Sequence, residues 1–294
     1  MLFRSPDASR FDLGMSHPTH FEAFRIKVGV DDLVEAEQLI QPVPDVNLSD
    51  FFGIIGERSN RVSLTGPAGV GFDNLIPMST PLPYVIRIEN PSDATRSVAE
   101  LRILQQLDAS LDVRSFQLSD LMLGDRLVDL PDGRGAFTGE FDFSETHGYI
   151  LQVTAGVDVN AHVATWLLRA VDPDTGLLVT DPKLGLLSPG AVAAAGFSVK
   201  ALPEAADGAR VTATARVIVD QGVPLDSNTV TATIDAVAPV TALTVQAFGN
   251  GTYALQWTVR DNALGAGVKD STVYVSLNGA PFSPFRSKTT ETEL

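Results

Sequence analysis

The chain reads RVTATARVIV from residue 210 to residue 219, and apolar and polar side chains alternate along this stretch. In an extended strand, successive side chains point to opposite faces, so every second residue shares a face. The apolar face comprises Val211, Ala213, Ala215, Val217 and Val219. Alternation of this kind is typical of a half-buried antiparallel strand. The stretch therefore predicts β-structure with one face in a core.

The same alternation recurs from about Pro81 to Asp235. The apolar members of four further strands are Tyr84, Ile86 and Ile88; Phe137, Phe141 and Phe143; Ala164, Trp166 and Leu168; and Val230, Ala232 and Ile234. Turn-forming sequences separate these runs, at residues 90–93, 131–133 and 172–176. Many short strands without intervening helices predict an all-β fold, an antiparallel immunoglobulin-like β-sandwich.

Composition narrows the class of protein. The chain has 294 residues, 44% of them hydrophobic, with 24 glycines and 18 prolines, which suits strands joined by turns. It has no cysteine, so disulfides and thiolate metal sites are excluded, and a bacterial surface protein is favoured over a small animal secreted domain. The net charge of −15 disfavours nucleic acid as a partner. Because no run of 18 apolar residues occurs, we expect no membrane insertion in this segment.

Three regions follow from the patterns. Residues 1–65 predict a connector or the tail of a preceding domain, partly helical, with Asp31 as a helix cap. Residues 66–237 predict the immunoglobulin-like domain. Residues 238–294 predict a second β-sandwich module, in which Asn278-Gly279 signals a hairpin turn with positive φ at both positions. This last region has roughly half to two-thirds of the usual length of about 100 residues, so we expect a truncated module and a fragment of a longer protein.

The region from residue 66 to residue 235 resembles an uncharacterised conserved-repeat family, immunoglobulin-like, of very large bacterial surface and secreted proteins. The matching runs are residues 83–90 (PYVIRIEN), 106–108 (QLD) before Leu111-Asp112, 115–118 (SFQL), 153–158 (VTAGVD), 172–176 (DPDTG), and 227–229 (SNT) before Ile234-Asp235. The chain departs from the family pattern after Leu187, at Ser188-Pro189-Gly190. Residues 238–294 are similar to the first strands of a fibronectin type III-like module, with Trp257 in the second strand.

The resemblance implies modules in series and no catalytic residues. We therefore expect a non-catalytic structural or adhesive module of a large bacterial extracellular or cell-surface protein. Its partners would be neighbouring modules of the same polypeptide, and a surface protein or a glycan. The alternative is an accessory region, glycan-binding or spacer, of a secreted multidomain enzyme. The domain content of the complete protein would discriminate between the two.

One cluster of carboxylates is a candidate for chemistry. Asp172, Asp174 and Asp181 lie near one turn, and Ca²⁺ is bound by six to eight oxygens that loops supply. The sequence lacks the EF-hand pattern, and Asp and Gly also occur in turns for backbone reasons. A structural calcium at these three residues is thus the one cofactor hypothesis. Asp261, Asn262 and Asp270 make a weaker case of the same kind.

Other candidates are weaker still. His17 and His20 are close in sequence, but Pro18 disfavours the helix on which they could share a metal. Trp166 and Trp257 lie on apolar strand faces, so we expect core residues rather than an exposed sugar-binding platform. No catalytic motif of a hydrolase or metalloprotease occurs. The sequence predicts no catalytic site and no cofactor-binding site.

Overall fold

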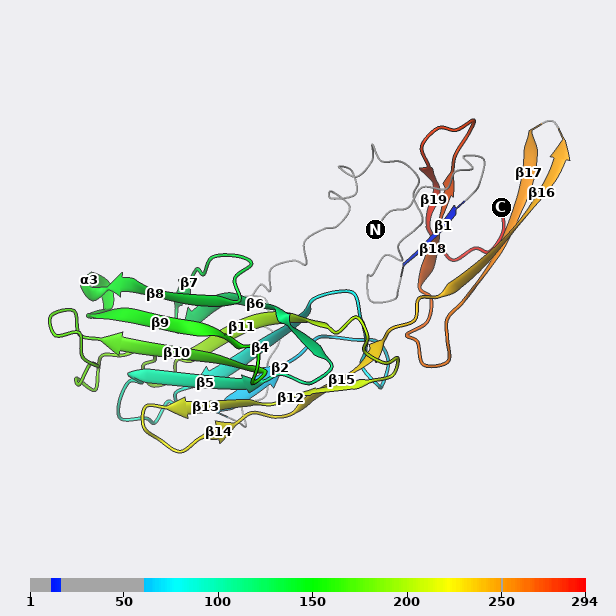
Figure 1. Ribbon diagram of the computed structural model, residues 1–294. Coiled ribbons are helices and arrows are strands. Elements are labelled where there is room, and N and C mark those ends of the chain that lie inside the picture. Colours follow the sequence, from blue (N-terminus) through cyan, green and yellow to red (C-terminus); the bar gives the residue numbers. More distant parts are fainter. Residues whose placement is uncertain (1–11, 17–60, 250) are drawn as a thin grey trace.

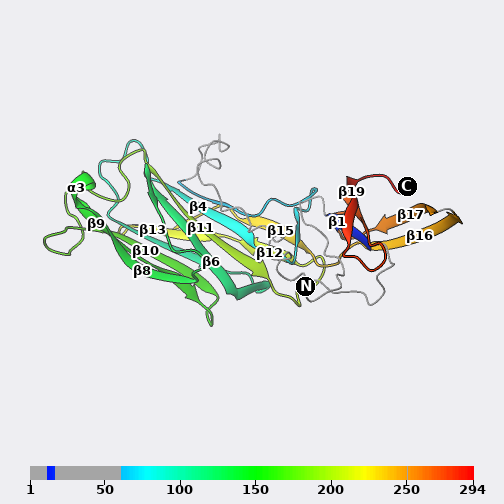
Figure 2. The same cartoon turned by 90° about the horizontal axis from the view of Figure 1, so that it is seen from above.

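The computed structural model describes residues 12–16, 61–249 and 251–294 of the chain. Two facing β-sheets form a sandwich, and a smaller β-rich part follows at one end (Figure 1). Both views place the sandwich and the second part end to end (Figures 1 and 2). Among the residues described, no helix is long and apolar enough to span a membrane.

The first sheet has six strands, and each neighbouring pair is antiparallel. In spatial order the strands are β14 (Leu225–Asp226), β13 (Ala215–Val219), β5 (Glu100–Gln106), β10 (Val163–Val171), β9 (Tyr149–Asp158) and β8 (Ala136–Phe143). A single turn of helix, α3 (Ser144–His147), joins β8 to β9 at the end of the sandwich far from the second part (Figure 1).

The second sheet has five antiparallel strands: β2 (Val62–Thr65), β4 (Leu82–Glu89), β11 (Val192–Ala201), β6 (Leu111–Leu123) and β7 (Arg126–Val128). Register shifts between β11 and β6 bend the centre of this sheet. A small third sheet contains β12 (Arg210–Ala213), β15 (Val230–Asp235) and β3 (Leu75–Pro77). The pairing of β15 with β3 is parallel, whereas that of β15 with β12 is antiparallel.

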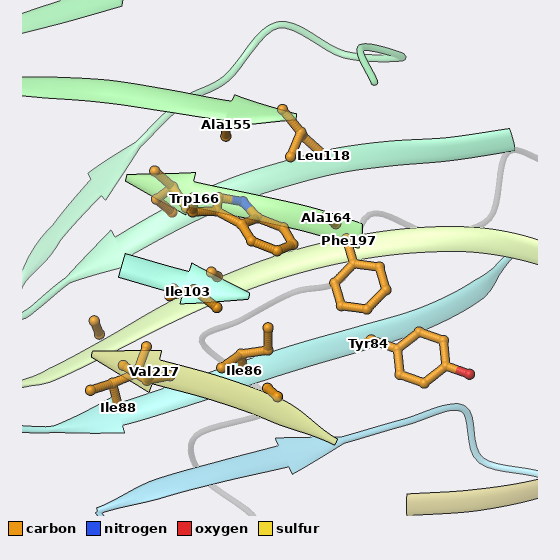
Figure 3. Close-up of a cluster of buried hydrophobic side chains, with 14 of the residues drawn as sticks. Tyr84, Ile86, Ile88, Ile103, Leu118, Ala155, Ala164, Trp166, Phe197 and Val217 are labelled. Carbon is orange, nitrogen blue, oxygen red and sulfur yellow. The ribbon is translucent and has the colours of Figure 1, made fainter. Parts of the chain in front are cut away.

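Aromatic side chains from both sheets fill the space between them. The ring of Phe197 on β11 stacks on that of Tyr84, with centroids 4.9 Å apart, and lies 5.5 Å from the ring of Phe116. Trp166 on β10 faces them from the other sheet, 5.8 Å from Phe197 (Figure 3). All four side chains are buried, as are the aliphatic residues of β4 around them. The alternation read from the sequence thus predicts the inward-facing residues correctly.

The stretch at residues 210–219 forms two strands rather than one. Strand β12 pairs with β15 in the small sheet, and β13 pairs with β5 in the six-stranded sheet. The chain changes sheets at Thr214, whose hydroxyl forms a 2.8 Å hydrogen bond with that of Thr229. Val211 in β12 and Val217 in β13 are both buried. A strand that switches sheets keeps its alternation, so the pattern does not reveal the break.

The second part contains β16 (Val240–Gly249), β17 (Thr252–Arg260), β18 (Asp270–Val275) and β19 (Ser283–Thr289). β16 and β17 form a hairpin, while β18 pairs with β19 on one side and with β1 (Asp12–Ser16) on the other. Its core is small: Leu255, Trp257 and Val273 are buried.

The predicted fold class is confirmed, because strands of antiparallel sheets make up nearly all the regular structure. Asn278 and Gly279 have φ of 53° and 84°, the positive values that the hairpin signal predicts. The region boundaries at residues 65 and 237, and the likeness to a fibronectin type III module, stay predictions. The predicted helical turns of the N-terminal region, and His17 and His20, lie outside the described residues.

Truncation of Phe197 tests whether the aromatic cluster holds the two sheets together. We expect Phe197→Ala to lower the free energy of unfolding by about 3–5 kcal/mol, because it removes a buried ring and leaves a cavity. Urea denaturation followed by tryptophan fluorescence measures the change. The matched control is Phe72→Ala, since Phe72 is fully exposed and its loss should cost less than about 0.5 kcal/mol. Equal losses in the two variants would contradict this account of the core.

Candidate functional site

The predicted calcium ligands lie in the loop between β10 and β11, where the carboxylates of Asp172 and Asp181 cap turns. One oxygen of Asp172 accepts hydrogen bonds from the backbone N–H groups of Asp174 and Thr175, at 3.0 and 2.9 Å, and from the Thr175 hydroxyl at 3.0 Å. The bonds from Thr175 hold the pKa of Asp172 below its usual range. Asp181 accepts the backbone N–H of Lys183 at 2.9 Å. These contacts are those of Asx turns, which orient the backbone.

No group of three or more carboxylate or imidazole side chains suited to a metal ion occurs in the described part of the chain. Asp172, Asp174 and Asp181 therefore do not gather into such a group, and the structural calcium stays a prediction. Turn capping explains the positions of Asp172 and Asp181 without a metal. Trp166 and Trp257 are buried, as expected of core residues, so neither offers a platform for a sugar ring.

The groups with raised pKa values lie in the sandwich core or at its edge. Burial raises the pKa of both Tyr84 and Tyr149. Desolvation also raises the pKa of Asp120, although the backbone N–H of Leu130 opposes this by donating to its carboxylate at 2.9 Å. Functional sites often combine perturbed pKa values with a cleft. Here the perturbed groups are packing residues, turn caps, or the exposed ion pair of Arg216 with Asp226, which raises the pKa of Arg216 and lowers that of Asp226.

A hollow of about 730 Å³ opens at the end of the sandwich where α3 lies. Its lining includes Arg126, His147 and Lys183, together with Asp125. Two cationic side chains and one imidazole thus line the same hollow as one carboxylate. These basic groups belong to a chain with a net charge of −15. The arrangement suits a ligand with negative charge.

Arg126 holds the wall of this hollow together. Its guanidinium donates to the carbonyl oxygens of Leu123 and Leu186, at 3.0 and 2.7 Å, and to the hydroxyl of Tyr149. It also lies over the rings of Tyr149 and Phe143, 5.5 and 5.9 Å from their centroids. The side chain therefore joins the β6–β7 turn, the start of β9 and the loop before β11. Arg126 is a positioning residue here, and the ring of His147 is held by Phe143, Tyr149 and the Thr146 hydroxyl. Lys183 is therefore the adaptable group.

A second polar site joins the sandwich to the β-rich part that follows. One carboxylate oxygen of Asp207 accepts the backbone N–H of Ala236 at 2.9 Å, and the other accepts the side-chain amide of Asn262 at 2.6 Å. Asp235, at the end of β15, accepts the backbone N–H of Ala266 at 3.0 Å. We call these contacts the junction. Two hydrogen bonds with carboxylate acceptors thus cross between the parts, besides the linker of residues 236–239.

The loop at residues 261–267 is shaped for this contact. Asp261 accepts the backbone N–H of Asn262 at 2.9 Å and that of Gly267 at 2.6 Å, which closes the loop on itself. On the sandwich side, Gly208 has φ of +76°, and a Cβ there would lie 3.2 Å from a methyl group of Leu264. Glycine therefore suits both the backbone and the approach of the loop. Asp261 and Asn262, the weaker calcium candidates of the sequence, take part in the junction loop, and the sequence gives no sign of this role.

Comparisons with known proteins give no family. No protein-family model matches the chain, and no curated protein matches it in sequence. Among solved structures, the full-length major pilin SpaD from Corynebacterium diphtheriae matches with 12% identity and a TM-score of 0.34. That match covers 80% of this chain and 49% of the pilin, so this chain spans about half of the pilin's length.

Two adhesins match at similar levels. The Actinomyces fimbrial adhesin FimA has 16% identity and a TM-score of 0.33, with 63% of this chain and 58% of that protein covered. The collagen-binding domain of a Staphylococcus aureus adhesin has 12% identity and a TM-score of 0.31, with 61% and 99% covered. Scores this low carry no argument about function.

Removal of divalent cations tests the predicted calcium site. If Asp172, Asp174 and Asp181 hold calcium in solution, EDTA lowers the Tm, since a ligand that binds only the folded state stabilises it. Thermal melting followed by circular dichroism, with and without EDTA, measures the shift. The variant Asp172→Asn should then melt at the same temperature in both conditions. A wild-type Tm that EDTA leaves unchanged eliminates the site.

Proposed function

We propose that the chain is a non-catalytic structural module of a large bacterial protein that lies outside the cell or on its surface. The observation that carries the proposal is the junction, because a module that spaces or displays others must hold its neighbour in a defined orientation. The lack of cysteine and the acidic, all-β sequence support the location. Neighbouring modules of the same polypeptide are the partners that this role requires.

Asp207 is the centre of this junction. It belongs to the sandwich, and its two oxygens bind the linker and the loop of the second part at the same time. A hydrogen bond to a charged group contributes about 1.5–3 kcal/mol, more than one between neutral groups. The second crossing bond, from Ala266 to Asp235, lies beside the linker and restricts rotation about it. The two parts should therefore tumble in solution as one body.

Loss of the Asp207 carboxylate tests this coupling. We expect Asp207→Ala to separate the motions of the two parts, because Asn262 and Ala236 lose their shared acceptor. Backbone ¹⁵N relaxation measures the rotational correlation time of each part. The two times should agree in the wild type and differ in the variant, with the second part tumbling faster.

The matched control for this test is Asp181→Ala. It removes a carboxylate that caps a turn of the sandwich, through the N–H of Lys183, at a place remote from the junction. The correlation times should stay equal in this variant. The structural proposal fails if the two parts of the wild type already tumble independently, or if Asp181→Ala separates them as Asp207→Ala does.

A second candidate function is that of a glycan-binding accessory region, and the hollow near α3 favours it. The hollow is lined by residues of α3 and of the β6–β7 turn, and α3 lies at the end of the sandwich opposite the second part (Figure 1). Its basic side chains, Lys183 and His147, suit a sugar that carries carboxylate or sulfate groups. A spacer alone gives no reason for such a cluster on an acidic protein.

A panel of acidic and neutral oligosaccharides distinguishes the two functions. For the accessory function we expect binding of acidic members only, weakened at least tenfold by Lys183→Glu, as the loss of a charge-assisted contact of about 1.5–3 kcal/mol predicts. Isothermal titration calorimetry measures the affinity. Lys200→Glu is the control, because Lys200 is exposed on β11 and does not line the hollow. No binding to any member of the panel removes this candidate.

A further inference from the structure

The imidazole of His147 is held in one position at the hollow near α3. The centroid of its ring is 5.8 Å from that of Phe143 and 6.4 Å from that of Tyr149. Its Nδ1 atom lies 2.8 Å from the hydroxyl oxygen of Thr146. The other ring nitrogen, Nε2, has no hydrogen-bond partner among the described residues. Because His147 lines the hollow, Nε2 is the nitrogen that a bound ligand can engage.

Lys183 lines the same hollow from the loop between β10 and β11. Its backbone is fixed on both sides, because its N–H donates to Asp181 at 2.9 Å and its carbonyl oxygen accepts the Ser97 hydroxyl at 3.1 Å. Ser97 is buried, so this anchor lies inside the sandwich. The Lys183 residue itself is exposed, and it forms no ion pair with any described residue. Its ammonium group can therefore meet a negative charge in the hollow.

Two further elements bring charged groups to the surroundings of His147. In the β6–β7 turn, Arg126 is engaged in the wall of the hollow and pairs with Asp125, whose carboxylate is 3.7 Å from the guanidinium. At α3 itself, Glu145 is exposed, and hydrogen bonds from the first residue of the helix hold the pKa of Asp142 below its usual range. Among these side-chain types, imidazole is the one that ordinarily changes its charge between about pH 5 and 8.

We propose that the hollow binds an anionic group between Lys183 and the protonated imidazole of His147, so that binding strengthens as the pH falls. When His147 is neutral, Lys183 alone supplies an uncommitted positive charge. When His147 is protonated, its Nε2–H becomes a charge-assisted donor on the same side of the ligand. The Tyr149 phenol adds no charge, because burial raises its pKa. The inference rests on the second candidate function for the site itself, and it adds how that site is regulated.

The sign of the pH effect follows from linkage. An anion that contacts His147 favours the protonated imidazole, so the extra affinity is present at low pH and is lost as the pH rises through the range in which imidazole titrates. Inorganic sulfate is a suitable probe, because it stays doubly charged over that whole range. A change in its affinity therefore reports on the protein.

Titration of the full chain with sulfate at constant ionic strength tests the proposal. The amide signals of Gly124, Lys183 and Ala191, which line the hollow, are followed in ¹H–¹⁵N spectra at about pH 5.5 and about pH 8. We expect the dissociation constant to be about fivefold lower at the acidic pH, as the gain of a charge-assisted hydrogen bond over a neutral one predicts.

Two histidine variants identify the group responsible. His147→Gln removes the titrating ring and should bind sulfate with one affinity at both pH values. His162→Asn is the matched control, because His162 lies in the β9–β10 turn outside the hollow, and asparagine tolerates its φ of 55°. This control should keep the gain at acidic pH. Circular dichroism at both pH values confirms that each variant is folded.

The possible failures are distinguishable. Equal sulfate affinities of the wild type at the two pH values overturn the inference and leave the glycan candidate standing, because the hollow would still bind an anion. A gain that persists in His147→Gln also overturns the inference, since it would then come from another group or from the net charge of the chain. If sulfate shifts none of these amide signals at either pH, the hollow takes no anion. The inference and the observation that favours the glycan candidate then fail together.

Discussion

The sandwich depends on one constraint, the filling of the space between two sheets by a few large rings. Facing sheets lie about 10 Å apart, so side chains from both must interdigitate across the gap. Phe197 contacts Tyr84 and Phe116 from its own sheet and Trp166 from the other. These rings fix the separation and the relative position of the sheets. The loops at both ends, including the hollow and the junction, take their positions from that core.

The sequence is sufficient to predict the fold class and most inward-facing residues, because alternation reports which side of a strand meets the core. Tyr84, Ile86 and Ile88 are buried as their spacing indicates. It is not sufficient to predict sheet membership. The run at residues 210–219 changes sheets at Thr214 without any change in period. Pairing partners are set by packing between distant segments, which a local pattern does not contain.

The junction is harder to predict from the sequence, because it too depends on contacts between distant segments. The sequence indicates Asp172 and Asp181 as candidate metal ligands because carboxylates lie close together there. In the folded chain their oxygens accept hydrogen bonds from nearby backbone N–H groups. Asp207 and Asn262, by contrast, are 55 residues apart and meet only in the folded chain.

The position of β15 has a mechanical consequence. This strand leads directly into the linker, and it is held on one side by β12, antiparallel, and on the other by β3, parallel. A pull on the linker along the axis of β15 therefore loads both ladders in shear, so their hydrogen bonds carry the force together rather than opening one after another from an end. The last strand of the sandwich is thus anchored on both sides where tension from the next module would enter.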